Sequence, residues 1–250
     1  MGDAAPFYTT DPKGFFIGHL KNEMVGCISA VAYDDCFGFI GFYIVVPSYR
    51  HQGIGLQLWK RGLAHLSGRI IGLDGVLEQQ KNYEKSHFIL YYKNARFEGI
   101  GGGGVRSKNL IDLKHVPFES LCNYDASIFG IQRGIFLKHW IEMSGAYLRA
   151  KVEMGRLRGY GVLRKCEKGY KVGPLFCDDV ETAFEIFQDF RAHIAEFPIF
   201  LDIPELNAER NKIVEAFHLK SVFQTVRMYN KPPPKQELDK VFGVTTFELG

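Results

Sequence analysis

The chain has 250 residues, of which 46% are hydrophobic and 24% are charged. This composition is ordinary for a protein with a sizeable core, and it excludes a chain that is mainly disordered. The formal net charge is only +3 and the lysines and arginines are scattered, so no basic stripe indicates a nucleic-acid-binding protein. Domains commonly hold about 100–150 residues, so we expect two of them.

The first hundred residues predict an antiparallel meander followed by alternating helices and strands. Runs rich in β-branched and aromatic residues, separated by short polar breaks, predict the strands. From Gly53 the apolar spacing becomes that of a helix packed on a sheet. The predicted strands of this half are 14–20, 23–33, 37–46, 69–74 and 89–99, with helices from Gly53 and within 77–88.

The glycine-rich run GIGGGG (99–104) matches G-x-G-x-x-G and follows a predicted strand. A dinucleotide-binding turn must supply the N-terminus of a helix, whereas the following VRSKNLIDLKHV predicts another strand. We interpret the run as a linker between two domains, with nicotinamide-dinucleotide binding as a distant alternative.

The second half repeats the order of elements of the first. Both LDGVLEQQKNYEKSHF (73–88) and LDIPELNAERNKIVEAFHL (201–219) begin Leu-Asp at a strand end, and YEKSHF matches VEAFHL at the close of a helix. This predicts duplication of one unit, with domains over 1–103 and 104–250. The predicted strands are 110–116, 145–154, 158–166, 169–177, 198–204, 223–229 and 241–249, and the predicted helices are 118–143, 179–196 and 207–219.

The cysteines and the apolar runs bear on the cell compartment. The five cysteines form no CxxC pair and are odd in number, which fits reduced thiols and neither a disulfide framework nor a zinc site. No apolar run approaches the roughly 18–20 residues of a membrane helix, and the start lacks a signal peptide's apolar stretch. We expect a soluble cytoplasmic protein with no metal site and no membrane or nucleic-acid partner.

The segment PSYRHQGIG (47–55) joins the third predicted strand to the first helix. A helix N-terminus exposes unpaired N–H groups and a partial positive charge, which favour an anion close to the backbone. Glycine at 53 and 55 removes side chains that would keep a pyrophosphate away, and Arg50 adds a permanent charge. The GK[ST] ending of a P-loop is absent, which disfavours ATP and GTP. On these residues alone, a plain strand-to-helix turn is an equal alternative.

Two further motifs flank this segment, YIVVP (43–47) before it and YEKSHF (83–88) after it. Together with Arg50-His51-Gln52-Gly53-Ile54-Gly55, they resemble the GNAT superfamily of acetyl-CoA-dependent N-acyltransferases, in which Arg or Gln is followed by x-x-Gly-x-Gly/Ala. Many members of that family also have Tyr-Glu-Lys-Leu-Gly-Phe on the next helix. The resemblance implies an α/β fold with a mixed sheet, built from two GNAT-like domains in tandem.

The resemblance also implies where acetyl-CoA would bind as co-substrate. Amides of residues 51–56 would hold its pyrophosphate, and strand backbone groups would hold its pantetheine arm. An N–H near Val45 would face the thioester oxygen, where an oxyanion develops during acyl transfer. The residues expected to bind the coenzyme are Tyr43, Ile44, Val45, Arg50, His51, Gln52, Gly53, Ile54, Gly55 and Leu56.

Three residues are candidates for catalysis. Tyr83 falls at the family's usual general-acid position, from which it would protonate the departing thiolate, and packing at a domain seam is its alternative role. The attacking amine must be neutral, so a base or a water relay is needed. Asp74 and Glu78 are the carboxylates nearest in sequence, although either also suits a solvated or capping role.

The sequence departs from the family pattern in both halves. Val76 and Gln79 stand where many members have Asn and Ala, and the first strand begins near Gly14, so we expect the first domain to lack the usual N-terminal strand and helices. In the second half Asp178 and Asp179 stand where a pyrophosphate would lie and would repel it.

The second half also lacks a general acid, because Val214 takes the place of Tyr83. We therefore expect one catalytic domain and one degenerate domain, reused for substrate binding or for a homodimer. Four of its residues could contact an acceptor or serve the structure: Asp125, Arg133, Trp140 and Asp202.

The leading hypothesis is an N-acetyltransferase in which a primary amine of a small molecule attacks the thioester of acetyl-CoA directly. The alternative is a non-catalytic acyl-CoA-binding module that regulates a partner. That module would keep the glycine loop and would need neither Tyr83 nor a base.

Overall fold

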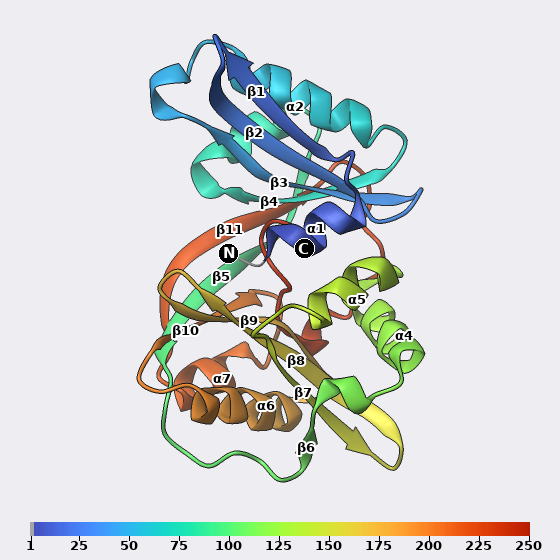
Figure 1. Ribbon diagram of the computed structural model, residues 1–250, viewed down its shortest axis with the longest axis vertical. Helices are drawn as coiled ribbons and strands as arrows, with labels where there is room; N and C mark the ends of the chain where they lie inside the picture. The colour runs from blue at the N-terminus through green and yellow to red at the C-terminus, as the bar shows by residue number, and fades with distance from the viewer. Residues whose placement is uncertain (1–2) are drawn as a thin grey trace. The chain divides into compact units, whose positions relative to one another are not determined.

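The computed structural model describes residues 3–250, which pack into two units (Figure 1). The N-terminal unit comprises Asp3–Tyr91, Val226–Pro233 and Phe247–Gly250. The C-terminal unit comprises Tyr92–Thr225 and Pro234–Thr246. Neither unit is one continuous stretch of chain. The predicted boundary after residue 103 concerns the two repeats in chain order and stays a prediction.

The N-terminal unit is built around the predicted meander. Its elements are α1 (Ala4–Thr10), β1 (Phe15–Leu20), β2 (Glu23–Ala32), β3 (Phe37–Val45), α2 (Ile54–His65), β4 (Ile70–Val76), α3 (Gln80–Glu84) and the start of β5 (Ile89–Ile100). Strands β1, β2 and β3 pair antiparallel, and β3 pairs in parallel with β4. The sheet is therefore mixed, as predicted.

Helix α2 covers one face of this sheet because its apolar side chains recur at helical spacing. Leu58 and Trp59 are buried against alternate residues of β2, among them Ile28 and Ala30. Gly62 allows the close approach of helix and sheet, because an added Cβ would lie 3.3 Å from the Ile28 side chain. Burial of such apolar surface contributes about 25 cal/mol per Å².

The N-terminal unit is completed by chain from the end of the sequence. Strand β11 (Lys220–Tyr229) lies beside β4 in the strand order, and its residues from Val226 onward belong to this unit. Asn230, just after the strand, accepts a hydrogen bond from the Ile71 amide at 2.7 Å and donates one to the Ile71 carbonyl at 3.2 Å. A strand of the second repeat thus lies next to a strand of the first.

The C-terminal unit has the same succession of meander, helix and strand. Its elements are β6 (Leu110–Ile111), α4 (Phe118–Phe129), α5 (Gly134–Ile141), β7 (Tyr147–Glu153), β8 (Arg156–Cys166), β9 (Gly169–Cys177), α6 (Val180–His193), β10 (Pro198–Pro204), α7 (Arg210–Ala216) and β12 (Val241–Gly243). The strands follow the order β5, β10, β9, β8, β7, β6, and β12 pairs with β9.

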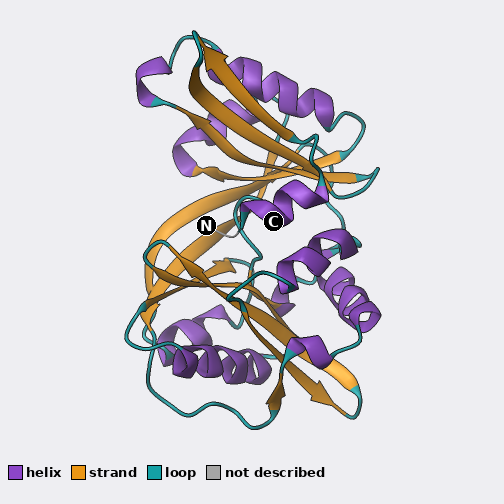
Figure 2. Cartoon of the chain, viewed as in Figure 1, coloured by secondary structure: helices purple, strands orange, loops and turns teal. Residues whose placement is uncertain are grey.

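Helices cover both faces of this second sheet (Figure 2). Tyr160 on β8 points to α4, where its hydroxyl contacts Asp125, whereas a Cβ added at the next residue, Gly161, would meet Phe190 of α6 at 2.9 Å. Successive strand residues face opposite sides of a sheet, so α4 and α6 lie on opposite faces.

Three predicted elements differ from the structure. The helix predicted over 118–143 is two helices, because Gly130 adopts a left-handed φ of 94° that ends α4. The strand predicted over 110–116 is only two residues long and is followed by a 3-10 turn at Leu113–His115. Of the predicted strand 241–249, only Val241–Gly243 pairs as a strand.

Two further expectations concern the N-terminus and the membrane. Between residue 3 and the first strand the structure has one short helix, α1, and no strand. Within residues 3–250 no helix combines the length and the apolar character needed to cross a membrane. All five cysteines are free thiols.

Candidate active site

Strands β3 and β4 separate at the centre of the N-terminal unit. They pair only from Phe37 with Ile70 to Ile40 with Leu73. The following residues, Gly41–Val45 on β3, have no partner on β4 among the described residues. Backbone groups of β3 that would otherwise be used in the sheet therefore face the space between the two strands.

An irregularity in β3 lies at the start of this opening. The register between β2 and β3 shifts there, and Phe42 has a positive φ of 45°, which is strained for a residue with a bulky side chain. The thiol of Cys27 donates a hydrogen bond to the Phe42 carbonyl at 3.3 Å. The conformation re-aims the residues that follow, Tyr43 and Ile44, which are both exposed.

The N-terminus of α2 is open to an anion. Gly53 adopts a left-handed conformation with φ 78°, no side chain caps the helix, and a Cβ added at Gly53 would have no atom within 4 Å. His51 also has a positive φ, of 63°. Backbone N–H groups in such alternating conformations converge on an anion.

The remaining loop residues lie around this helix end. The Arg50 side chain folds back and donates from Nε to the Val45 carbonyl at 3.1 Å, and Gln52 donates to the Ser48 carbonyl at 3.2 Å. Ile54, Gly55 and Leu56 form the first turn of α2. The Arg50 side chain thus connects the loop to the end of β3.

The ring of Tyr83 packs directly on Gly75 of β4, at a distance that leaves no room for a side chain at residue 75. A Cβ at Gly75 would lie 2.3 Å from Cε2 of the Tyr83 ring. Burial, and secondly the nearby Tyr43, raise the pKa of Tyr83 to about 12. A phenol with a raised pKa keeps its proton at neutral pH, so it can donate that proton to a developing anion.

Trp59 holds this tyrosine in place. Its ring lies 5.5 Å from the ring of Tyr83 and 5.5 Å from that of Tyr43, measured between centroids. Its Nε1–H donates to the Ser86 hydroxyl at 2.9 Å, on the turn that follows Tyr83. Such aromatic contacts add about 0.5–1.5 kcal/mol beyond the burial of area.

The two candidate bases differ in their surroundings. Asp74 is buried, and both of its oxygens accept from Arg227, from Nε at 2.8 Å and from Nη2 at 2.6 Å. Glu78 is exposed in the 3-10 turn Leu77–Gln79. A base needs a lone pair directed at the proton it takes, and a bidentate pair with a guanidinium occupies those of Asp74.

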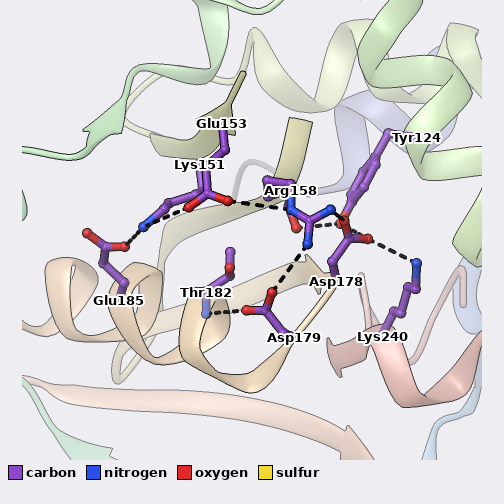
Figure 3. Close-up of polar contacts among 9 residues, drawn as sticks. All are labelled: Tyr124, Lys151, Glu153, Arg158, Asp178, Asp179, Thr182, Glu185 and Lys240. Atoms are coloured by element: carbon purple, nitrogen blue, oxygen red, sulfur yellow. Dashed lines mark hydrogen bonds and ion pairs between the residues drawn. The ribbon is translucent and has the colours of Figure 1, made fainter. Parts of the chain in front are cut away.

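The equivalent junction of the C-terminal unit, between β9 and α6, is filled by the protein's own carboxylates (Figure 3). Asp179 caps α6 by accepting from the Thr182 amide at 2.8 Å. Asp178 pairs with Arg158 Nη1 at 2.9 Å and with Lys240 Nζ at 3.0 Å. Burial alone would raise the pKa of Asp179, but hydrogen bonds with Thr182 and the charge of Arg158 lower it. Asp179 therefore stays ionised at the position that corresponds to the start of α2 in the first repeat.

The four acceptor-contact candidates of the second half are buried in structural contacts. Arg133 donates to Asp125 through two nitrogens, each at 2.8 Å. Trp140 donates to the Gly173 carbonyl at 3.0 Å, and Asp202 accepts from Arg96 at 2.7 and 2.8 Å. The structure therefore favours the structural alternative for all four.

Sequence reasoning missed three residues of the site: Trp59, Ser86 and Arg227. Trp59 lies within the apolar helix predicted from Gly53, and Ser86 lies within the YEKSHF segment, but the sequence did not identify either as a site residue. Arg227 lies 153 residues from its partner Asp74. A signal for it existed, because the repeat that matches Leu73-Asp74 with Leu201-Asp202 also matches Arg227 with Arg96.

Two family profiles cover most of the chain. Residues 2–91 match the acetyltransferase (GNAT) family, and residues 121–243 match an acetyltransferase (GNAT) domain. The chain belongs to the GNAT acetyltransferases. It carries two GNAT domains in tandem and is an N-acetyltransferase, so the predicted family, fold class and enzyme class are confirmed.

Relatives of this GNAT protein are similar over most of its length. The holothin acyltransferase of Pseudoalteromonas sp. (strain SANK 73390) is 28% identical over 252 residues, covering 100% of this chain and 86% of the relative. An uncharacterised N-acetyltransferase of Bacillus subtilis (strain 168), YitH, is 23% identical and covers 90% of this chain and 81% of its own.

Solved structures share the fold of this GNAT protein. A candidate acetyltransferase of Pyrococcus horikoshii has a TM-score of 0.87 at 23% identity, covering 100% of this chain and 84% of the other. A tandem GNAT protein from the clavulanic acid biosynthesis pathway has a TM-score of 0.62 at 13% identity, covering 92% and 88%.

Proposed function

We propose that this protein transfers an acetyl group from acetyl-CoA to a primary amine of a small molecule, by direct attack of the amine on the thioester. The observation that carries the proposal is the open N-terminus of α2, where Gly53 leaves the backbone amides accessible, in the same unit as Tyr83, whose ring packs on Gly75 of β4. The first repeat would be catalytic, and the second repeat, with its acid-filled junction, would be degenerate.

The coenzyme would lie along the loop and the unpaired part of β3. Amides of His51, Gln52, Gly53, Ile54, Gly55 and Leu56 would bind the pyrophosphate, with Arg50 adding positive charge nearby. Backbone groups of Tyr43, Ile44 and Val45 would bind the pantetheine arm, because β4 does not use them in this region. The glycines support this placement, since a side chain at residue 53 would extend into the space that the phosphates need.

The reaction would need three functions from the chain. An N–H near Val45 would stabilise the oxyanion formed when the amine nitrogen bonds to the carbonyl carbon. As the carbon–sulfur bond breaks, the Tyr83 hydroxyl would give its proton to the thiolate. The proton lost by the amine would pass to Glu78 or to water, since Arg227 already occupies the oxygens of Asp74.

The proposal is tested by incubating the purified protein with acetyl-CoA and a panel of small primary amines. Free thiol should appear only when an accepted amine is present, and mass spectrometry should find that amine heavier by one acetyl group. Binding of acetyl-CoA without thiol release for any amine would contradict the transfer reaction and favour a binding module.

A further inference from the structure

In each repeat, the strand that follows the YEKSHF or VEAFHL segment extends into the unit built around the other repeat. The first repeat ends with β5, yet residues Asn94–Ile100 of β5 pair antiparallel with β10 of the second repeat, in the C-terminal unit. The corresponding strand of the second repeat is β11, and its residues from Val226 belong to the N-terminal unit, beside β4. In both repeats the equivalent strand therefore extends into the unit built around the other repeat.

Each exchanged strand carries an arginine that forms a buried ion pair, and the two ion pairs involve equivalent residues of the two repeats. Asp74 on β4 accepts from Arg227 on β11, and Asp202 on β10 accepts from Arg96 on β5, each through both carboxylate oxygens. The side chains of Asp74 and Asp202 are both 0% exposed. A buried carboxylate needs such a partner, because an unpaired charge is costly to remove from water.

The two arginines correspond in sequence as well. The repeat aligns the close of YEKSHF with the close of VEAFHL, and each arginine follows that point at the same distance in the chain. Each repeat therefore carries an aspartate on one strand, β4 or β10, and an arginine on the next strand in the chain, β5 or β11, but both ion pairs join one repeat to the other.

The second repeat contributes a further segment to the N-terminal unit. The Leu249 carbonyl accepts from the Tyr33 hydroxyl at 3.0 Å, and a Cβ added at Gly41 would lie 2.3 Å from the Glu248 carbonyl oxygen. Gly41 lies two residues before Tyr43, at the beginning of the strand opening. Chain from the second repeat thus packs directly against the strand that carries the candidate site.

We propose that the two repeats have exchanged the equivalent strands β5 and β11, so that the second repeat completes the catalytic unit with β11, Arg227 and residues 247–250. The strand that pairs with β4 comes from a second copy of the same repeat, here supplied within one chain. A repeat cut off after residue 103 lacks these segments and is an incomplete catalytic unit.

The exchange is tested in the full-length chain with a specific protease site inserted after Gly103, a glycine with no atom within 4 Å of an added Cβ. Cysteines replace Glu98 and Phe200, which are directly opposed on β5 and β10. Opposed antiparallel residues are close enough for a disulfide. After oxidation and complete cleavage, non-reducing electrophoresis should show one band of full-length mass.

The matched control carries Glu98→Cys alone and should give two fragments after the same treatment. Two fragments from the double variant under non-reducing conditions would overturn the exchange, because Glu98 and Phe200 are neighbours only if β5 lies beside β10. This arm needs no coenzyme, so it stands apart from the proposed function.

A second arm measures acetyl-CoA binding and rests on the proposed function. The cleaved chain without engineered cysteines should bind acetyl-CoA as the intact chain does. Fragment 1–103, separated in denaturant and refolded alone, should bind at least tenfold more weakly, and adding fragment 104–250 during refolding should restore binding. Full affinity in fragment 1–103 alone would overturn the inference, whereas no binding by the intact chain would overturn the proposed function instead.

Discussion

The two strand-to-helix junctions of this tandem GNAT protein occupy the same place in their repeats and have opposite chemistry. At the start of α2, Gly53 is left-handed and no side chain caps the helix. At the start of α6, Asp179 caps the helix and Asp178 is paired with Arg158 and Lys240. Under the proposed function, the second repeat would have lost an anion site, because a carboxylate of the chain would take the place of the ligand's phosphate and caps the end of the helix.

The substitution Gly53→Glu places a carboxylate at the start of α2, as Asp179 does at the start of α6. The glutamate puts bulk and negative charge at the open helix end, so we expect acetyl-CoA affinity to fall by at least about 100-fold while the fold persists. Isothermal titration calorimetry measures the affinity and circular dichroism the fold. The matched control is Gly68→Glu, since Gly68 also has a positive φ and open space but lies beyond the other end of α2.

Unchanged affinity in Gly53→Glu, with the same folded spectrum, would remove the α2 N-terminus from the coenzyme site. Equal losses in Gly53→Glu and Gly68→Glu would indicate that strain at a left-handed residue, and not the phosphate site, causes the effect.

The matching ion pairs of the two units should differ in their contribution to stability. Arg227→Met leaves the Asp74 charge buried, which should lower the free energy of unfolding by about 3–5 kcal/mol. Arg96→Met should cost less, because the Arg96 side chain is 24% exposed against 2% for Arg227, and Lys171 still lies 3.5 Å from Asp202. Urea denaturation of both variants measures the difference, and a larger loss in Arg96→Met would contradict this ranking.

The two repeats should also differ in their need for a phenol, since only the first has one at this position. Tyr83→Phe should leave the affinity for acetyl-CoA unchanged and lower kcat by about 100-fold, because the thiolate departs without a proton. Tyr124→Phe is the matched control, a half-buried tyrosine of the C-terminal unit whose hydroxyl donates to the Arg158 carbonyl. An unaltered kcat in Tyr83→Phe would exclude Tyr83 as the acid.

The raised pKa of Tyr83 adds a pH test to that substitution. A general acid acts below its pKa, and the pKa of Tyr83 is raised to about 12. We therefore expect kcat to show no fall due to Tyr83 up to about pH 10. A fall near pH 8–9 that disappears in Tyr83→Phe would contradict the raised pKa.

The smallest effect is expected at the capped junction. Asp179→Ala removes the hydrogen bond to the Thr182 amide and should lower the free energy of unfolding by about 1 kcal/mol, without changing acetyl-CoA affinity. The pKa of Asp179 is lowered in the folded protein, so its contribution is present above the ordinary value of 3.8 and is lost as pH falls below it. Denaturation of both proteins at neutral and acidic pH tests this, and a stability difference that grows in acid would contradict it.

Much of the fold followed from local sequence. The meander strands and α2 were predictable because their apolar spacing is a property of neighbouring residues. The loop from Arg50 to Gly55 was predictable for the same reason, since a helix N-terminus and its glycines act within one turn. The break at Gly130 was missed because a left-handed residue within an apolar run leaves the helical spacing intact.

The rest of the site depends on contacts that local patterns do not contain. Asp74 was a candidate base because the sequence gives no local sign of its partner Arg227, which lies near the far end of the chain. Local sequence also does not determine whether β5 or β11 pairs with β4, because the two strands are equivalent in their repeats. Trp59 was missed for a different reason. Its apolar position in the helix predicts that the side chain is buried, but it does not predict that the ring contacts Tyr83.

The central claim is that only the junction before α2 binds the coenzyme, and the stoichiometry of binding tests it most directly. Calorimetric titration with acetyl-CoA should give one site per chain in the intact protein and in Asp179→Ala, and no site in Gly53→Glu. Two sites per chain, or one site that survives Gly53→Glu, would contradict the account.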